Sequence, residues 1–330
     1  MRKNAIILGA SLFMGCSSSP GAGNYTVPEN KIFVINGYKA SSKDFPSIGA
    51  LVFNDGMTEA CTVSIIKKDL ALTAAHCVDY DIQKAMVLYG KDEVFEDRCK
   101  SDDCAQYLFP IATAKVHSLY DDNLLTENHH DFALLLLKRE ITNAEPIEFL
   151  SKEDFSKVLR IGDNVTIAGY GSYNWELLGT THNGKLFAAD IPITGYYNFS
   201  EIIVGEKDPA KGNACFGDSG GPVYVYAHGQ VRLTGVASRI AEPSDQGFYE
   251  CGKSGIIYGL PTLEQNWIES EYKAMREKYP LEAPLVPEES KDNGATGGFS
   301  CQISSQSPSS TTSSGLIGLL LAGYLLRKRK

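Results

Sequence analysis

Short apolar segments separated by turn residues fill the middle of this chain and restrict the folds open to it. The clearest are residues 48–53, 131–137, 164–168 and 222–226. Strands of this length at short intervals are typical of a β-sandwich or barrel, not of alternating β and α units. The 31 glycines and 14 prolines agree with many turns. We therefore predict an all-β body for the chain, over residues 34–275.

One helix is expected near the end of this body. Leu263, Trp267, Ile268 and Tyr272 recur at the spacing of an amphipathic helix. No internal repeat is visible in the sequence, so the fold is not expected to be a repeat array.

Composition narrows the function classes. The chain has 330 residues, enough for one large domain or two medium ones. Its 31 basic and 40 acidic side chains give a formal net charge of −9, so an overall basic surface for nucleic acid is absent and no such partner is expected. The 17 tyrosines and 14 phenylalanines supply apolar surface for a core, which excludes disorder throughout.

The first residues are typical of an export signal. Residues 1–16 place Arg2 and Lys3 before an apolar run that ends at Cys16, and this run is too short for a typical membrane-spanning helix. The segment Leu12–Cys16 resembles a bacterial lipoprotein box, although Phe13 stands where leucine is commonest. We expect lipidation of Cys16, with residues 17–33 as tether and propeptide. A plain signal peptide with an incidental cysteine is the alternative.

The last residues form a second membrane-type signal. Residues 276–314 are expected to be a linker, rich in serine and threonine at its end, and residues 315–330 are an apolar tail closed by four basic residues. The twelve apolar or small residues would rise about 18 Å as a helix, short of a ~30 Å hydrocarbon core. The layout resembles the C-terminal sorting tails of some Gram-negative surface proteases, and a simple tail anchor is the alternative. We predict export to a bacterial periplasm, outer membrane or cell surface, or secretion after tail processing.

Three short segments carry the chemistry: Leu72–Cys77, Asp131–Leu135 and Cys215–Pro222. Each alone has an ordinary explanation, as a core histidine, a capping aspartate or a glycine-rich loop. The third is the most restrictive, because its glycines allow the close backbone approach around Ser219 that an oxyanion hole requires. In the order His, Asp, Ser, the three segments together resemble the trypsin/chymotrypsin family of serine proteases, and that order differs from subtilisins and α/β-hydrolases.

The resemblance implies a fold and a mechanism. It implies two six-stranded antiparallel β-barrels, residues 34–145 and 146–275, with a C-terminal helix and the active site between the barrels. Ser219 would be the nucleophile, His76 its general base and acid, and Asp131 the group that orients the imidazole. The backbone N–H groups of Gly217 and Ser219 would form the oxyanion hole.

The family's disulfides have counterparts here. The resemblance implies the bridges Cys61–Cys77 and Cys215–Cys251, whereas Cys99 and Cys104 lie close together and are placed to clip an inserted loop. Cys301 is left unpaired in the tail. Disulfides agree with an oxidising, exported compartment. A zinc site is the alternative, which the absence of paired Cys-x-x-Cys spacings disfavours.

The family also implies a precursor. The segment Val34–Gly37 resembles the family's new N-terminus, so the amine of Val34 would pair with Asp218 after cleavage. Phe33 precedes Val34, where trypsin-activated relatives carry Lys or Arg. An activating protease is therefore expected as a partner, and it need not be trypsin-like.

The substrate pocket is expected to select uncharged side chains. Asn213, six residues before Ser219, would form its base, where an acidic residue would be needed to pair with Lys or Arg. Ser238, Ile240 and Gly255 would form its walls, with Ile240 narrowing the pocket. We expect a preference for small or medium uncharged P1 residues in a protein or peptide substrate.

No cofactor or metal is expected. The loop after the histidine segment is acidic, which we interpret as solvated surface in preference to a Ca²⁺ site; its acidic residues are Asp92, Glu93, Glu96, Asp97, Asp102 and Asp103. His129 and His130 lack the context of His76 and are predicted to be surface loop residues.

Three functions remain open at this point. The first is an exported serine endopeptidase made as a zymogen. The second is an esterase that uses the same triad. The third is a catalytically inactive surface binding or adhesion protein on the same fold, which the presence of all three triad residues disfavours.

Overall fold

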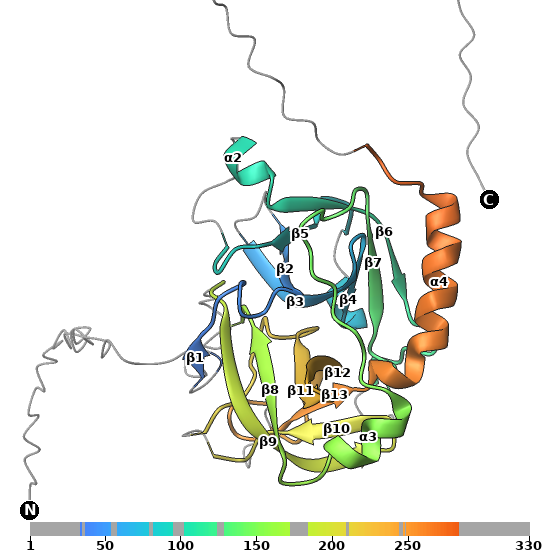
Figure 1. Cartoon of the computed structure of the whole chain (residues 1–330). Helices are drawn as coiled ribbons and strands as arrows, with labels where there is room; N and C mark the ends of the chain where they lie inside the picture. The colour runs from blue at the N-terminus through green and yellow to red at the C-terminus, as the bar shows by residue number, and fades with distance from the viewer. Residues whose placement is uncertain are drawn as a thin grey trace, which may run out of the picture. The chain divides into compact units, whose positions relative to one another are not determined.

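The computed structural model describes residues 34–283 apart from residues 35–36, 54–57, 79–81, 95–101, 124–128, 172–183, 209–210, 244–246 and 248. The expected signal, tether and tail segments, with Cys16 and Cys301, lie outside the described residues. Two closed six-stranded antiparallel β-barrels and a C-terminal helix make up the described part (Figure 1). The predicted fold class is confirmed.

The first barrel closes in the order β2-β3-β4-β7-β6-β5. Its strands are β2 (Ile48–Phe53), β3 (Thr58–Lys67), β4 (Leu70–Thr73), β5 (Met86–Tyr89), β6 (Leu108–Val116) and β7 (Ala133–Leu137). Every residue of β4 and β7 is buried. Such strands need no polar alternation, because one face points into the barrel and the other is covered by protein.

The second barrel closes through β8-β9-β10-β13-β12-β11, with β8 also paired to β9. Its strands are β8 (Asn164–Gly169), β9 (Phe187–Asn198), β10 (Glu201–Val204), β11 (Pro222–Ala227), β12 (Gln230–Ile240) and β13 (Ile256–Gly259). The short strand β1 (Tyr38–Lys39) adds to β9. Val34 lies in the core of this barrel with only 2% of its surface exposed.

The segments that connect the strands contain several short helices. They are the 3₁₀ turns η2 (Ala75–Val78), η3 (Ile82–Lys84) and η5 (Pro261–Glu264), and the helices α2 (Asp102–Ala105) and α3 (Lys152–Val158). Ser151 caps α3, because its side chain accepts the N–H of Asp154 at 3.2 Å.

The C-terminal helix α4 (Gln265–Lys278) follows the second barrel in the chain but packs on the first, beside β7 (Figure 1). Ile268 and Met275 are buried in the first barrel's core. Arg276 bonds Asp69 at 2.7 Å and the carbonyl of Leu137 at 3.1 Å. No helix within the described ranges is long and apolar enough to span a membrane.

Candidate active site

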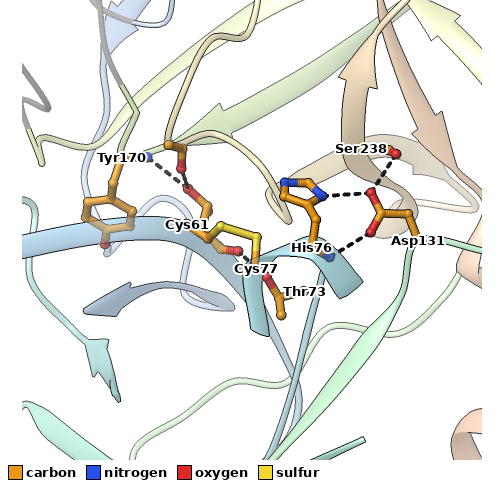
Figure 2. Close-up of a disulfide and its surroundings, with 9 residues drawn as sticks. Cys61, Thr73, His76, Cys77, Asp131, Tyr170 and Ser238 are labelled. Carbon is orange, nitrogen blue, oxygen red and sulfur yellow. Dashed lines mark hydrogen bonds and ion pairs between the residues drawn. A yellow bond between two sulfur atoms is a disulfide. The ribbon is translucent and has the colours of Figure 1, made fainter. Parts of the chain in front are cut away.

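His76 lies on η2, directly after the buried strand β4. The disulfide Cys61–Cys77 fastens this turn to β3, and Thr73 donates to the carbonyl of Thr62 at 2.9 Å. Figure 2 shows the imidazole above the disulfide, directed at Asp131. The turn is therefore held on both sides of the histidine by a covalent and a hydrogen-bonded link.

Asp131 is buried and accepts from three donors. Its Oδ1 accepts the backbone N–H of His76 at 3.1 Å, and its Oδ2 lies 2.8 Å from His76 Nδ1 and 2.7 Å from the hydroxyl of Ser238 (Figure 2). Burial acts to raise the pKa of the Asp131 carboxyl, but the bonds from His76 and Ser238 outweigh it and hold the pKa below its ordinary value. An ionised carboxylate at Nδ1 keeps the proton there and leaves Nε2 as the basic nitrogen.

Ser219 lies on a tight loop that reaches the first barrel. Gly217 and Gly220 both have positive φ, 91° and 77°, which side chains with a Cβ rarely adopt. The carbonyl of Ser219 accepts the N–H of Thr62 at 2.9 Å, and that of Gly217 accepts the Thr62 hydroxyl at 3.0 Å. The loop that carries Ser219 is thus bonded to strand β3 of the other barrel.

Three of the five backbone N–H groups from Gly217 to Gly221 are hydrogen-bonded to protein. Those of Asp218, Gly220 and Gly221 donate to backbone carbonyls at 2.8–3.0 Å. Those of Gly217 and Ser219 have no acceptor among the described residues. Unengaged backbone donors of this kind are what an oxyanion hole needs.

Asp218 is buried beneath this loop. Its Oδ1 accepts the N–H of Gly171 at 3.0 Å, and its Oδ2 accepts the N–H of Cys215 at 2.9 Å. A Cβ on Gly169 would lie 2.1 Å from Oδ1, so only glycine fits there. The carboxylate therefore fixes the segment between Cys215 and Ser219.

A cavity of about 360 Å³ lies at the candidate site. His76 and Ser219 lie on it together, and most of its remaining surface is apolar. The other lining residues are Ala214, Cys215, Phe216, Ala237, Ser238, Arg239, Ile240, Tyr249, Cys251 and Ile256.

The Trypsin family model matches residues 34–254 of the chain. The chain belongs to the trypsin family. Human chymotrypsin-like elastase family member 1 is 25% identical over 231 residues, 67% of this chain and 86% of the relative. Serine protease SSP1 of Scolopendra subspinipes is 27% identical over 259 residues, 73% and 84% of the two chains. CLIP domain-containing serine protease B10 of Anopheles gambiae is 30% identical over 217 residues, 58% of each. Membership supports serine peptidase chemistry at the level of the family.

Two pocket residues of this trypsin-family chain lie elsewhere than expected. Asn213 is fully buried and does not line the cavity, because its amide donates to the carbonyl of Ser254 at 2.8 Å and accepts from Ala214 N–H at 2.9 Å. Gly255 packs against Ile203, and a Cβ there would lie 2.6 Å from it. Ser238 and Ile240 line the cavity as expected.

Several residues that line the cavity were not predicted from the sequence. Ile256 replaces Gly255 in the wall and pairs with Ile240 across β12 and β13. Phe216 and Tyr249 add aromatic surface, and both are exposed. Only strand register distinguishes Ile256 from its neighbours, and register is not written in the local sequence.

The disulfides of the described residues are Cys61–Cys77 and Cys215–Cys251, as the family implies. Cys104 is disulfide-bonded, and its expected partner Cys99 lies outside the described residues. The Cys215–Cys251 bridge lines the cavity beside Ser219.

The prediction of two surface histidines is wrong. His129 is 3% exposed, and His130 is half-buried and stacked on His117 at a centroid distance of 4.7 Å. Burial, and then the charge of Arg239, lower the pKa of His129. His130 pairs with Glu264 of η5, and the charges of Arg239 and Glu201 act on His129, so both histidines interact with residues that the local sequence does not indicate.

Two clusters of side chains in the described part of the chain resemble metal-binding sites. In the first, Cys61 and Cys77 are already joined as a disulfide beside His76. In the second, His117 and His130 face Glu264 at 3.3 and 3.1 Å. The N–H of Leu119 donates to His117 Nδ1 at 3.2 Å. Metal bound at Nε2 would place a proton on Nδ1 against that donor, so this cluster fits a hydrogen-bonded His–Glu contact better than a metal.

The acidic loop is partly engaged with protein. Asp92 accepts the N–H and the hydroxyl of Ser42 at 2.7 and 2.8 Å, and Glu93 pairs with Lys185 at 3.6 Å. Asp92 is therefore a structural acceptor, which corrects the solvated-surface interpretation for that residue. Glu96 and Asp97 lie outside the described residues.

Proposed function

We propose that this chain is an exported serine endopeptidase, with Ser219 as nucleophile, His76 as general base and Asp131 as the residue that orients it. The observation that carries the proposal is the His76–Asp131–Ser238 hydrogen-bond line, which ends at a cavity that Ser219 shares. Because Nδ1 is held at a carboxylate, Nε2 is the nitrogen available to take the Ser219 proton.

The proposed reaction uses these groups in order. His76 removes the proton of the Ser219 hydroxyl as its oxygen attacks a substrate carbonyl. The N–H groups of Gly217 and Ser219 bind the oxyanion of the tetrahedral intermediate, and one such donor is worth about 3 kcal/mol in the transition state. His76 then gives the proton to the leaving amine, and water repeats the sequence on the acyl-enzyme.

The cavity supports a preference for uncharged P1 side chains of small or medium size. Ile240 and Ile256 are paired β-branched residues in its wall. No carboxylate is among the described residues that line it, so a Lys or Arg side chain would enter without a counter-ion.

We also propose activation by cleavage and a membrane-associated, exported location. Val34 is already buried in the second barrel, and Asp218 is the buried carboxylate to which a new Val34 amine would turn. The disulfides agree with an oxidising compartment. Lipidation at Cys16, the tail signal at residues 315–330 and a bacterial source remain proposals from the sequence.

The proposal is tested with a fluorophosphonate probe and a protein substrate on the mature enzyme. We expect Ser219 to be labelled and the protein to be cleaved, and both to be lost in Ser219→Ala. Ser156→Ala, on the exposed face of α3, is the matched control and should retain both. Ester hydrolysis without protein cleavage would favour an esterase, and no labelling of the mature protein would favour an inactive binding protein.

A further inference from the structure

Behind Asp131 lies a buried ion pair between two strands of the second barrel. Arg239 of β12 donates to Glu201 of β10 from both terminal nitrogens, at 2.9 and 3.0 Å. Their side chains are 11% and 3% exposed. Asn198 gives Glu201 a further bond at 2.8 Å, and the ring of Tyr197 lies 5.1 Å from the guanidinium. The ion pair between β12 and β10 is therefore held in place by residues of β9 as well.

Hydrogen bonds connect this ion pair to Asp131 through Ser238. Arg239 Nη1 lies 3.3 Å from the hydroxyl oxygen of Ser238, which in turn donates to Asp131 Oδ2 at 2.7 Å. A guanidinium can only donate. It therefore occupies a lone pair of the Ser238 oxygen and leaves the hydroxyl proton for Asp131.

We propose that Arg239 is a positioning residue, which orients the Ser238 hydroxyl toward Asp131, and that Glu201 is the counter-ion that neutralises Arg239 beside the His76–Asp131 pair. The inference deepens the proposed function and rests on it. It gives a role to a charged residue in the wall of a mostly apolar cavity.

The charged and titratable groups around Arg239 and His76 decide whether the Arg239 charge raises or lowers the pKa of His76. Glu201 faces Arg239 from β10, Tyr197 from β9, and His129 from the segment before β7. Asp131 faces His76, and Asp121 acts on His129. With Glu201 ionised, the Arg239 charge is balanced. Without it, an uncompensated cation near His76 disfavours the imidazolium and lowers its pKa.

The experiment compares Glu201→Gln with the double variant Glu201→Gln/Arg239→Met in the mature enzyme. For Glu201→Gln we expect the acid limb of kcat/KM to move to lower pH by about half a unit. For the double variant, which carries no charge at this site, we expect the limb to return close to that of the wild type. Its plateau kcat should be about tenfold lower, because Ser238 has lost its donor. KM should change little.

Asp69→Asn is the matched control, because Asp69 is a buried carboxylate that pairs with Arg276 and lines no part of the cavity. It changes the net charge by the same amount as Glu201→Gln and should leave the acid limb in place. Thermal unfolding of all variants shows which are folded. The double variant replaces the ion pair by neutral side chains, an exchange that proteins often tolerate.

A second readout does not need activity. In Ser219→Ala, the His76 imidazole is titrated by NMR with and without Glu201→Gln, and the same downward shift is expected. The inference is wrong if Glu201→Gln leaves both the acid limb and the His76 titration unchanged, or if the double variant keeps the full kcat. It is also wrong if the variants change only KM for peptides with acidic side chains, because Arg239 would then bind substrate. An inactive wild type with the expected NMR shift would refute the proposed function alone.

Discussion

Gly220 meets Thr73 so closely that a Cβ on the glycine would lie 2.0 Å from the threonine hydroxyl oxygen. Thr73 ends β4 of the first barrel, three residues before His76, and Gly220 follows Ser219 in the second. The contact brings the two halves of the candidate site to one place, and it depends on the absence of a single methyl group.

We expect Gly220→Ala to lower the free energy of unfolding by about 2–5 kcal/mol, the sum of the positive-φ cost and overpacking, and to abolish cleavage of a peptide substrate. Gly229→Ala is the control, because φ is 78° there and only Tyr226 Oη lies within 4 Å, at 3.8 Å. Urea unfolding measures the free energy of unfolding of both variants. Equal losses in the two variants would mean that the contact with Thr73 is unimportant.

Asp131→Asn should lower kcat by about 10⁴-fold near neutral pH while the fold is retained. The amide removes the charge that stabilises the imidazolium and the acceptor that keeps the proton on Nδ1. Asp190→Asn, at an exposed site on β9, should have no effect. Steady-state kinetics with a peptide substrate decide the matter, and a kcat within tenfold of wild type would contradict the assigned role.

Ile256→Ala should widen the cavity. We expect the ratio of kcat/KM for a Phe P1 substrate to that for an Ala P1 substrate to rise by about tenfold or more. Ile257→Ala is a close control, because Ile257 is buried on the same strand but is not among the described lining residues. A series of peptide p-nitroanilides provides the measurement. Dominant cleavage after Lys or Arg in the wild type would refute the proposed preference.

Because the pKa of Glu264 is lowered in the folded protein, we expect this residue to contribute to a loss of stability in acid. The hydrogen bond from His117, with the nearby His130, lowers the pKa of Glu264 below its ordinary value of 4.5 despite burial. A lowered folded-state pKa contributes stability above the unfolded-state pKa, and this is lost as pH falls from about 4.5 through the folded value. Glu264→Gln should therefore be less stable at pH 7 and lose less on acidification.

Urea unfolding between pH 7 and pH 3 tests this prediction. Glu269→Gln is the control, because Glu269 is half exposed on α4 and pairs with Lys67 at the surface. It should follow the wild-type pH dependence. A Glu264→Gln curve parallel to that of the wild type would show that Glu264 contributes nothing to the acid limb.

The all-β body was predicted from short apolar segments between turn residues, and the two-barrel fold was implied by the resemblance to the trypsin/chymotrypsin family. The segment 131–137 was expected as a strand, and β7 begins two residues later, at Ala133; Asp131 precedes it, with its carboxylate bonded to His76 and Ser238. The pairing of Cys61 with Cys77, which the family resemblance implied, agrees with the structure.

What the sequence missed depends on contacts between distant segments. The pairing of Arg239 with Glu201 joins two strands of the second barrel, and the charges of both residues act on His129, which is distant in the sequence. Ile256, the first residue of β13, lines the cavity, whereas Gly255 lies just before that strand and is not among the described lining residues. Asn213 is not among the described lining residues, and its amide donates to the carbonyl of Ser254, a contact that the sequence did not indicate.

The path of α4 has a mechanical consequence. The chain crosses between the barrels before β8 and again after β13, where Ile268, Met275 and Arg276 anchor it to the first barrel. If α4 moved away from the first barrel together with the second, those two apolar side chains would become exposed and the Arg276–Asp69 ion pair would break. The spacing between the barrels is thus established once, when the protein folds. Under the proposed function, selection among peptides would depend on the shape of their side chains and not on a hinged closure.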